Sequence, residues 1–265
     1  MRKLVTVPTI IDGLSDLGVC DGATLLVHCS MSSFGHIEGG AQSVVEALIA
    51  AVGLSGTLVM PTLTHGRFDP SEWRNPPAPK EQWERIRFET PAFHPDKTPT
   101  DHTMSSVYEL FRTWPGAVRT NHPHTSVAAW GKHRDRITQV HRLEERLGDS
   151  SPLGVLYELN AQVLFLGTNY ATNTCFHLAE YRRPNPPMRE FLIVQGDGDE
   201  RRLMTYTDVD TDSSIFEEIG ADFELKDEKG AEIQSGSIGD AECRLFSFRS
   251  AVDFAQDWLT GRSAS

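Results

Sequence analysis

Residues 23–60, ATLLVHCSMSSFGHIEGGAQSVVEALIAAVGLSGTLVM, decide the fold. The run 23–28 is almost continuously apolar, which is typical of a strand buried on both faces. Apolar side chains then recur at helical spacing between 41 and 52, and a second apolar strand, 57–60, ends at Pro61. A strand, a loop, a helix and a second strand in this order predict an α/β fold.

Similar patterns continue on both sides of this unit. Helices are expected at 6–18, 105–113, 132–145, 152–159 and 251–259, and a further strand at 163–166. Between the second strand and the next helix, residues 62–104 hold seven prolines and little periodicity. Such a long irregular stretch usually marks a functional cover or a mobile loop.

The last third of the chain has a different character. Phe191–Val194 and Arg202–Tyr206 flank a GDGD turn and predict a β-hairpin. An acidic helix follows, and then a strand pair around Ile233 and Cys243–Phe248. No repeat or low-complexity segment divides the chain. We therefore expect one domain over 1–265, in which 185–250 forms at most a smaller antiparallel β and helix appendage on the substrate side.

Charge and apolar patterning exclude several classes of protein. The 25 Lys and Arg against 37 Asp and Glu give a formal charge of −12, which disfavours nucleic acid and favours a cationic small molecule. No run approaches the roughly 20 apolar residues of a membrane span, so we expect a soluble protein. Asp12 and Asp16 interrupt the apolar N-terminus. A signal peptide is therefore not expected, and a cytoplasmic location follows by default.

Negative charge is concentrated between residues 208 and 224. The acidic residues there are Asp208, Asp210, Asp212, Glu217, Glu218, Asp222 and Glu224. A solvated helix face would show this pattern. The alternative is an acidic wall for a polyamine substrate, with Asp208, Asp210, Glu217 and Glu218 as its candidate contacts.

The best candidate for the chemistry is residues 167–183, GTNYATNTCFHLAEYRR, directly after the strand at 163–166. The stretch opens with turn formers and then becomes helical, so His177 and Glu180 lie one turn apart, next to Thr174. An imidazole and a carboxylate side by side at the mouth of a strand can act as a general base and its orienting partner. A solvated pair on a surface helix has the same spacing, so the pattern alone leaves both interpretations open.

A second candidate is the hydroxyl-rich loop Ser30–Gly35, which precedes the Gly39-Gly40 step into a helix. Backbone N–H groups and the positive end of a helix dipole can bind an anion such as a pyrophosphate. The GxxxxGK and GxGxxG spacings are absent, so an ordinary loop between a strand and a helix fits equally well.

The turn at 119–126, RTNHPHTS, and the turn GDSSPLG at 148–154 hold further candidates. Two nearby histidines can indicate a metal site, but no CxxC or HExxH accompanies them, so no metal is expected. Arg119 is instead a candidate phosphate partner, with a loop salt bridge as the alternative. Asp149 is interpreted as a helix cap with a further role toward a substrate amine. Cys29 and Cys175 are interpreted as small core residues, because neither is expected to face a neighbouring histidine.

Six blocks, taken in order, resemble the aminoglycoside 3-N-acetyltransferase family. They are VHCSMSSFG (27–35) with GG (39–40), GTLVMPTLT (56–64), FHPDKTPT (93–100), RTNHPHTSVAAWG (119–131), LGDSSPLG (147–154) and VLFLGTNYATNTCFHLAEYRR (163–183). The likeness covers roughly the first 185 residues and extends more loosely to the end. Cys29 stands where the family usually has Ser, and Ser105 where it usually has Gly.

This resemblance implies a three-layer α/β/α body with a mostly parallel central sheet. It also implies acetyl-CoA as donor and N-acetylation of an aminoglycoside, at the 3-N position. It places the base at His177, with Glu180 and Asp149 as candidate partners. The predicted coenzyme contacts are Ser30, Ser32, Ser33, Phe34 and Gly35, together with Arg119, His122 and Ser126.

The expected mechanism is direct transfer. A substrate ammonium loses a proton to His177, and the free amine then attacks the thioester carbonyl. Two alternatives stay open at this point. One is an acetyltransferase that acts on a different amine metabolite, and the other is a non-catalytic protein that binds CoA or an aminoglycoside. The sequence also leaves open whether the chain is a monomer or a homodimer.

Overall fold

A central sheet organises the computed structural model, which describes residues 4–64, 67–73, 76–196, 198–227, 230 and 232–263. In spatial order its strands are β10 (Ile233–Ile238), β11 (Ala241–Ser247), β7 (Gln162–Leu166), β2 (Thr24–Cys29), β4 (Thr57–Pro61), β6 (Val127–Gly131) and β5 (Val118–Arg119). The three central strands β7, β2 and β4 pair in parallel. At one edge, β10 and β11 pair antiparallel with each other and β11 with β7; at the other edge, β6 pairs antiparallel with β4 and with β5. Five of the seven strands, β10, β7, β2, β4 and β5, point the same way. The predicted α/β class and mostly parallel direction are confirmed.

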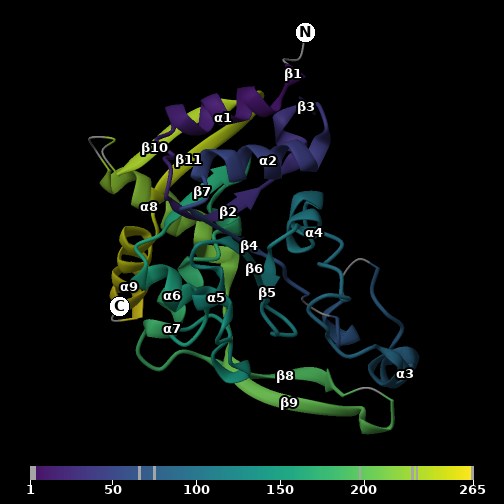
Figure 1. Ribbon diagram of the computed structural model, residues 1–265. Coiled ribbons are helices and arrows are strands. Elements are labelled where there is room, and N and C mark those ends of the chain that lie inside the picture. Colours follow the sequence, from purple (N-terminus) through teal and green to yellow (C-terminus); the bar gives the residue numbers. More distant parts are fainter. Residues whose placement is uncertain are drawn as a thin grey trace.

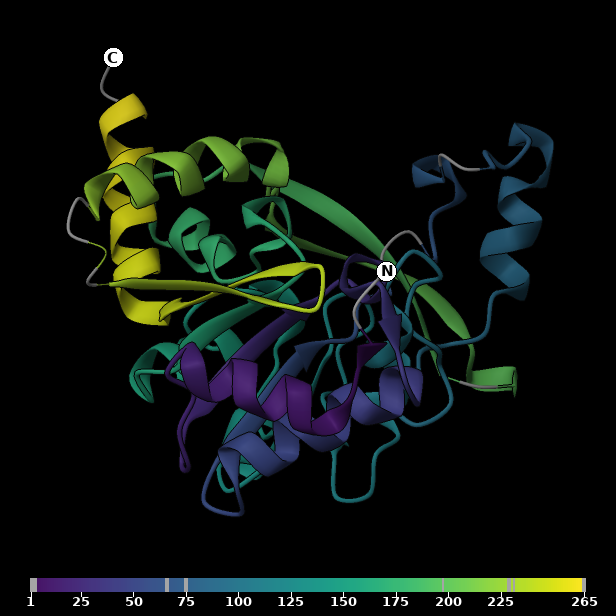
Figure 2. The same ribbon diagram turned by 90° about the horizontal axis from the view of Figure 1, so that it is seen from above.

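Helices cover both faces of this sheet (Figure 2). On one face lie α1 (Val7–Asp16), α2 (Gly40–Val52) and α4 (Ser106–Arg112). On the other face lie α5 (Arg134–Thr138), α6 (Pro152–Glu158), α7 (Phe176–Arg182), α8 (Phe216–Lys226) and α9 (Phe248–Ser263). The sheet is buried from both sides, which explains why β2 reads as a continuous apolar run.

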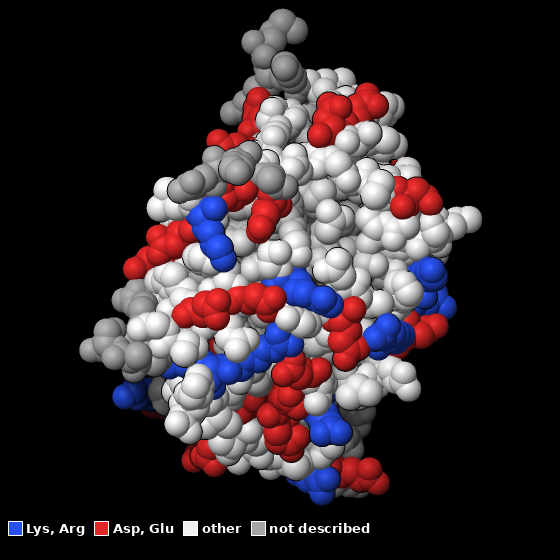
Figure 3. All heavy atoms as spheres, turned by 90° about the vertical axis from the view of Figure 1, so that its left-hand side faces the viewer, with Lys and Arg blue, Asp and Glu red and all other residues white. Residues whose placement is uncertain are grey.

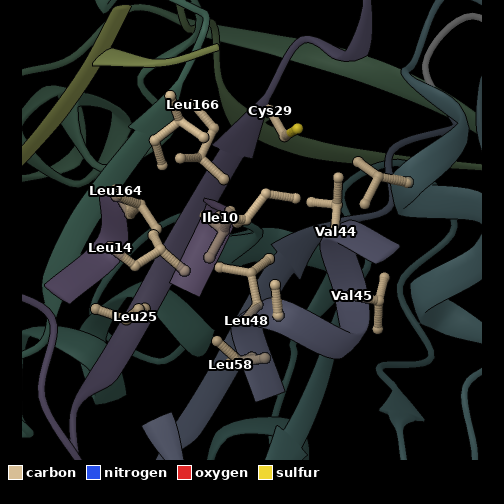
Figure 4. Close-up of a cluster of buried hydrophobic side chains, with 14 of the residues drawn as sticks. Ile10, Leu14, Leu25, Cys29, Val44, Val45, Leu48, Leu58, Leu164 and Leu166 are labelled. Atoms are coloured by element: carbon tan, nitrogen blue, oxygen red, sulfur yellow. The ribbon is translucent and has the colours of Figure 1, made fainter. Parts of the chain in front are cut away.

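The side chains of β2 alternate between the two cores. Leu25 and Cys29 point into the cluster that α1 and α2 cover, where Ile10, Leu48 and Leu166 meet them (Figure 4). Leu26 belongs to the opposite cluster, and the buried ring of His28 contacts Phe165 on that side. This alternation places the His28 side chain on the face of the sheet that α7 covers.

The prediction of one helix over 132–145 is wrong, because the observed helix is much shorter. The structure has α5 only to Thr138, followed by a 3-10 turn, η4 (Leu143–Glu145). The ring of His141 explains the break, because Nδ1 lies 2.9 Å from the Thr120 hydroxyl and Nε2 lies 2.7 Å from the carbonyl oxygen of Arg146. These long-range contacts hold the segment in a turn. The other predicted helices are present with shifts of a few residues at their ends.

Residues 185–250 do not form one appendage. Strands β8 (Met188–Gln195) and β9 (Arg202–Val209) form a hairpin with a sheet of its own, as predicted, and it extends along the bottom of Figure 1 toward α3 (Trp83–Glu89). By contrast, β11 pairs with β7, so β10 and β11 extend the central sheet. Only the hairpin half of the predicted appendage therefore stands apart from the main sheet.

The described part of the proline-rich segment 62–104 contains two 3-10 turns, η2 (Pro70–Glu72) and η3 (Lys80–Gln82), and α3. It packs on the hairpin through an ion pair between Arg189 and Glu72 and through Phe68, which joins the apolar cluster of the hairpin. These contacts fit a cover tied to a second element. Its closure over a substrate remains a prediction.

Other elements fall below the length that sequence patterns can reveal. The two-residue strands β1 (Leu4–Val5) and β3 (His36–Ile37) pair in parallel with each other, outside the main sheet. Within the described residues, no helix combines the length and the apolar character needed to cross a membrane.

Candidate active site

The predicted pair of His177 and Glu180 forms at the start of α7. His177 Nδ1 lies 2.6 Å from Glu180 Oε2, and the backbone N–H of Asp212 donates to Glu180 Oε1 at 2.7 Å. The Glu180 side chain is only 4% exposed, whereas that of His177 is 18% exposed. The carboxylate is thus held at both oxygens in a buried position, while the imidazole reaches the surface.

The ring of His177 is also fixed by packing. Its centroid lies 4.8 Å from that of Phe216, the first residue of α8. With Nδ1 bound to the carboxylate, Nδ1 carries the proton and Nε2 carries the lone pair. Nε2 has no hydrogen-bond partner among the described residues, so it is available to take a proton.

His28 stands next to this pair and was not identified as part of the site from the sequence. The backbone N–H of Thr174 donates to its Nε2 at 3.4 Å. Burial and, to a smaller extent, the proximity of His177 lower the pKa of His28 to about 3. His28 is therefore neutral and adds no charge beside His177. The signal that could have identified it is a single polar residue near the carboxyl end of an otherwise apolar strand.

Thr174, a predicted substrate contact, is buried beside His28. Its carbonyl accepts the N–H of His177 at 3.2 Å. Its position supports α7 and leaves little of its surface for a substrate.

A pocket of about 560 Å³ opens where β2 and β7 end. It is lined by Ser30, Ser33, Gly167, Thr168, Asn169, Asp240, Glu242 and Arg244. The carboxyl ends of parallel strands are where α/β folds commonly bind ligands. Two of the predicted coenzyme contacts, Ser30 and Ser33, therefore lie at a cavity suited to a small molecule.

Hydrogen bonds join the residues around this pocket. Ser33 Oγ donates to the carbonyl of Gly167 at 2.7 Å and lies 3.1 Å from Ser30 Oγ. The hydroxyls of Ser30 and the exposed Ser32 lie 3.2 Å apart. The result is a cluster of three neutral hydroxyls at the end of β2.

A chain of contacts leads from the pocket toward His177, which does not itself line it. Asn169 Nδ2 donates to Glu217 Oε1 at 2.6 Å. Glu217 follows Phe216, whose ring contacts His177. The pocket and the imidazole are therefore attached to the same helix, α8.

Phe34 and Gly35 have mainly structural roles. The side chain of Phe34 is fully buried in the core under α1 and α2, so it cannot line a coenzyme site. Gly35 has a φ of 83°, and a Cβ there would lie 2.7 Å from Asp240 Oδ2. Gly35 thus allows the turn after η1 (Met31–Phe34) to approach the β10–β11 connection.

The structure does not support Arg119, Ser126 and His122 as coenzyme contacts. Arg119 Nε donates to the hydroxyls of Thr62 and Ser126, Nη2 donates to the Thr62 carbonyl, and Nη1 donates to the carbonyls of Pro95 and Thr98. The guanidinium N–H groups that would bind a phosphate therefore already donate to protein oxygens. Ser126 and His122 are fully buried. Arg119 and Ser126 tie the proline-rich segment to β5 and to the residue before β6, whereas His122 binds His124 and Thr125 within its own turn.

Asp149 is neither the helix cap nor a partner of His177. Ser151 caps α6, since its hydroxyl accepts the N–H of Leu153 at 3.1 Å. Asp149 is 60% exposed and pairs with Arg182, at 2.6 Å from Nη2. Glu180 is consequently the carboxylate that contacts His177.

The predicted acidic wall does not form as one surface. Asp208 is fully buried and pairs with Arg146. Asp210 pairs with Arg189, and Glu224 with Arg244. Glu217 and Glu218 are exposed in the first turn of α8, and Glu217 binds Asn169. Figure 3 shows acidic and basic side chains interspersed on one face of the molecule.

Cys29 and Cys175 are unsuited to nucleophilic catalysis. Cys29 and Cys175 are buried, as predicted. Burial raises the pKa of the Cys29 thiol to about 12 and raises that of Cys175 as well. Among the residues that the structure describes, no group of three or more His, Cys, Asp or Glu side chains is arranged to hold a metal ion.

The sequence matches the model of a known protein family. The model of the aminoglycoside 3-N-acetyltransferase family matches residues 26–260, which is most of the sequence. The chain belongs to this family. As a member of the aminoglycoside 3-N-acetyltransferases, it is an acyltransferase.

Relatives of this acetyltransferase extend along nearly its whole length. The prophage-derived aminoglycoside N(3')-acetyltransferase-like protein YokD of Bacillus subtilis is 43% identical over 98% of this chain and 96% of its own length. Its crystal structure matches with a TM-score of 0.94 over 100% of this chain and 97% of that one, at 40% identity. Aminoglycoside N(3)-acetyltransferase VII of Streptomyces paromomycinus is 32% identical over 93% of this chain and 88% of its own. The structure of AAC-VIa bound to sisomicin matches with a TM-score of 0.85 and 25% identity, over 99% of this chain and 100% of that one.

Proposed function

We propose that this acyltransferase uses acetyl-CoA to acetylate an amino group of an aminoglycoside, with His177 as general base. The observation that carries the proposal is the hydrogen-bonded pair at α7. His177 Nδ1 is bound to a carboxylate that is itself held at both oxygens, and Nε2 is open. The membership of the chain in the aminoglycoside 3-N-acetyltransferase family supplies the reaction class.

The acceptor amine is protonated near neutral pH and must lose that proton before it can react. His177 Nε2 is placed to take it. The carboxylate of Glu180 then stabilises the imidazolium, while the Asp212 N–H keeps Glu180 in orientation. Acetyl-CoA supplies an acetyl group activated as a thioester, so that a C–N bond replaces the C–S bond and the sulfur leaves as a thiolate. The proton on His177 is returned to that sulfur or to water.

Direct transfer agrees with the state of the thiols. A covalent route would need a reactive cysteine near the base. Cys29 and Cys175 are buried, and burial raises the pKa of both thiols. A ternary complex of donor, acceptor and protein is therefore the route that the residues favour.

The pocket at the ends of β2 and β7 is our proposed site for the acetyl-pantetheine end of the coenzyme. Hydroxyls of Ser30 and Ser33 and the amide of Asn169 can pair with the amides of that arm. The carboxylates of Asp240 and Glu242, also in the lining, would repel the coenzyme's phosphates, and the cation in the lining, Arg244, is already paired with Glu224. A neutral group therefore suits this pocket better than a phosphate.

The acceptor is proposed from family and charge. The formal charge of −12 favours a polycation at long range. Sisomicin, an aminoglycoside, is the ligand of the related AAC-VIa structure. YokD, however, is named only as acetyltransferase-like, so a different amine acceptor is a second candidate.

A thiol-release assay with acetyl-CoA tests the proposal. The acceptors are a panel of aminoglycosides and a set of simpler polyamines, and the product is identified by mass. We expect thiol release that depends on an aminoglycoside and falls by about 10²–10⁴ in the variant His177→Ala. The control His102→Ala removes an exposed imidazole and should keep full activity.

Each other result has a definite meaning. Thiol release with the simpler amines alone would favour the second acceptor class. Binding of acetyl-CoA or an aminoglycoside without any turnover would indicate a sequestering protein. A His177→Ala protein that binds both substrates and retains most of its turnover would remove His177 from the role of base.

A further inference from the structure

A buried ion pair lies between α7 and the end of β9, outside the pair of His177 and Glu180. Arg146 Nη1 is 3.1 Å from Asp208 Oδ2, and the two side chains are 4% and 1% exposed. The same carboxylate oxygen accepts the backbone N–H of Arg146 at 3.0 Å and the hydroxyl of Tyr181 at 2.7 Å. Tyr181 belongs to α7, so this pair connects the helix of the base to the hairpin.

Arg146 also binds the chain that follows Asp208. Its Nη1 donates to the carbonyl of Val209 at 2.8 Å, and its Nη2 donates to Thr211 Oγ1 at 3.0 Å. The guanidinium lies over the ring of Phe191, 4.1 Å from the centroid. One side chain thus holds residues 208–211 at three points.

The hydrogen bond from the Asp212 N–H to Glu180 orients that carboxylate. The residues next to its donor and to its acceptor are both bound by the pair of Arg146 and Asp208. Asp212, whose N–H donates to Glu180 Oε1, directly follows Thr211. Tyr181, whose hydroxyl binds Asp208, directly follows Glu180. The network therefore fixes the distance between the donor and the acceptor of that hydrogen bond.

We propose that Arg146, Asp208 and Tyr181 are positioning residues for the general base, and this inference rests on the proposed function of His177. They act through Asp212 and Glu180 and contact no reacting atom. If the network loosens, the Asp212 N–H withdraws from Glu180, the carboxylate turns, and His177 loses the contact that keeps its lone pair at Nε2.

The free energy of a buried ion pair agrees with a positioning role. A buried ion pair is a weak source of stability, because the cost of removing two charges from water offsets most of their attraction. Its directional contacts nevertheless fix the geometry of the chain around it. Here those contacts hold the two segments whose separation the base requires.

The test is a double-mutant cycle between Tyr181→Phe and Glu180→Gln, with kcat and both KM values measured. Tyr181→Phe keeps the ring and removes one hydroxyl. We expect it to lower kcat about three- to tenfold, with KM values within about twofold of wild type. In the Glu180→Gln background, the same change should cost almost nothing further, because the route through Glu180 is already broken.

Two more variants sharpen the result. Thr211→Val removes a contact of Arg146 from the other side and should show the same dependence on Glu180. Tyr206→Phe is the matched control: this tyrosine is also buried on β9, but its hydroxyl binds His124 Nδ1, and kcat should not change. Thermal unfolding of each variant confirms that the fold is retained.

A Tyr181→Phe enzyme with full kcat would overturn the inference. So would an equal loss of kcat when Tyr181→Phe is made in the wild-type protein and in the Glu180→Gln variant. That result would show that the hydroxyl acts independently of the carboxylate. Either result leaves the proposed function intact as long as His177→Ala is inactive. Turnover retained by His177→Ala would instead remove His177 from the role of base, on which this inference rests.

Discussion

The Oε2 atom of Glu180 lies 2.6 Å from Nδ1 of His177, one helical turn away on α7. This contact selects the tautomer, because a carboxylate beside Nδ1 requires the proton to be there. Asp149, the other candidate partner, pairs with Arg182 on the same helix. Among the residues that the structure describes, His177 therefore contacts one carboxylate, and the role of that carboxylate can be tested alone.

Glu180→Gln should inactivate the enzyme while preserving its shape. Glutamine can offer its amide N–H to Nδ1, which then becomes an acceptor and shifts the imidazole proton to Nε2. A base with its lone pair on the wrong nitrogen should lower kcat by about a hundredfold or more, as in the Asp-to-Asn case of a serine protease triad. Steady-state kinetics give kcat, and equilibrium binding of acetyl-CoA gives the control. Unchanged kcat would show that the carboxylate does not set the tautomer.

The parts of the site that depend on local periodicity could be predicted from the sequence. Apolar runs and helical spacing predict the strand–loop–helix–strand unit at 23–60. Helical spacing also places His177 and Glu180 on one helix face. Contacts between distant segments could not be predicted. The Asp212 N–H and the ring of Phe216 reach the site only because β9 and α8 fold against α7.

Residue type was a poor guide where burial decides the role. Arg119 and Asp208 are charged, and the sequence therefore suggested ligand contacts for both. Each is instead buried within a network of protein groups. A single sequence carries little signal for this outcome, because Thr62, a partner of Arg119, and Arg146, the partner of Asp208, lie 57 and 62 residues away.

Gly167→Ala should weaken binding of acetyl-CoA. Gly167 has a φ of +67°, and a Cβ there would lie 2.5 Å from the Cβ of Ser33. The added methyl must displace Ser33 and narrow the pocket, so we expect the KM for acetyl-CoA to rise about tenfold or more. Gly18→Ala is the control, since its φ is +91° and nothing lies within 4 Å of its Cβ position. Equal KM values for the two variants would place the coenzyme elsewhere.

Arg119→Lys should lower stability more than it affects the coenzyme. A lysine ammonium cannot reproduce the fork of contacts to Thr62, Ser126 and the carbonyls of segment 62–104. We expect a loss of about 2–4 kcal/mol in the free energy of unfolding, measured by urea denaturation, and little change in the KM for acetyl-CoA. Arg85→Lys, at an exposed ion pair, is the control. Unchanged stability with a large rise in KM would restore the role of Arg119 as a phosphate partner.

Three histidines with lowered pKa values, His28, His122 and His141, should make the fold sensitive to mild acid. Burial lowers the pKa of His28 to about 3 and that of His141 to about 4, and it also holds the pKa of His122 well below the ordinary 6.5. The unfolded chain therefore binds more protons than the folded chain below pH 6.5. Their contribution to stability is complete above that pH and is lost as the pH falls toward the folded values.

The predicted slope is about 1.4 kcal/mol per pH unit for each such histidine, so His28 and His141 together should lower the free energy of unfolding by up to about 3 kcal/mol per unit as the pH falls from 6 toward 5, and His122 changes it in the same direction. Asp69, Glu109 and Asp212 have pKa values below those of ordinary carboxyls because hydrogen bonds stabilise their charged forms. Their contribution is lost only at lower pH, so it separates from that of the histidines. Urea denaturation at several pH values measures the slope, and His141→Gln should reduce it by about one histidine's share. A free energy of unfolding that stays constant from pH 7 to 5 would mean that these imidazoles can accept protons without leaving the folded state.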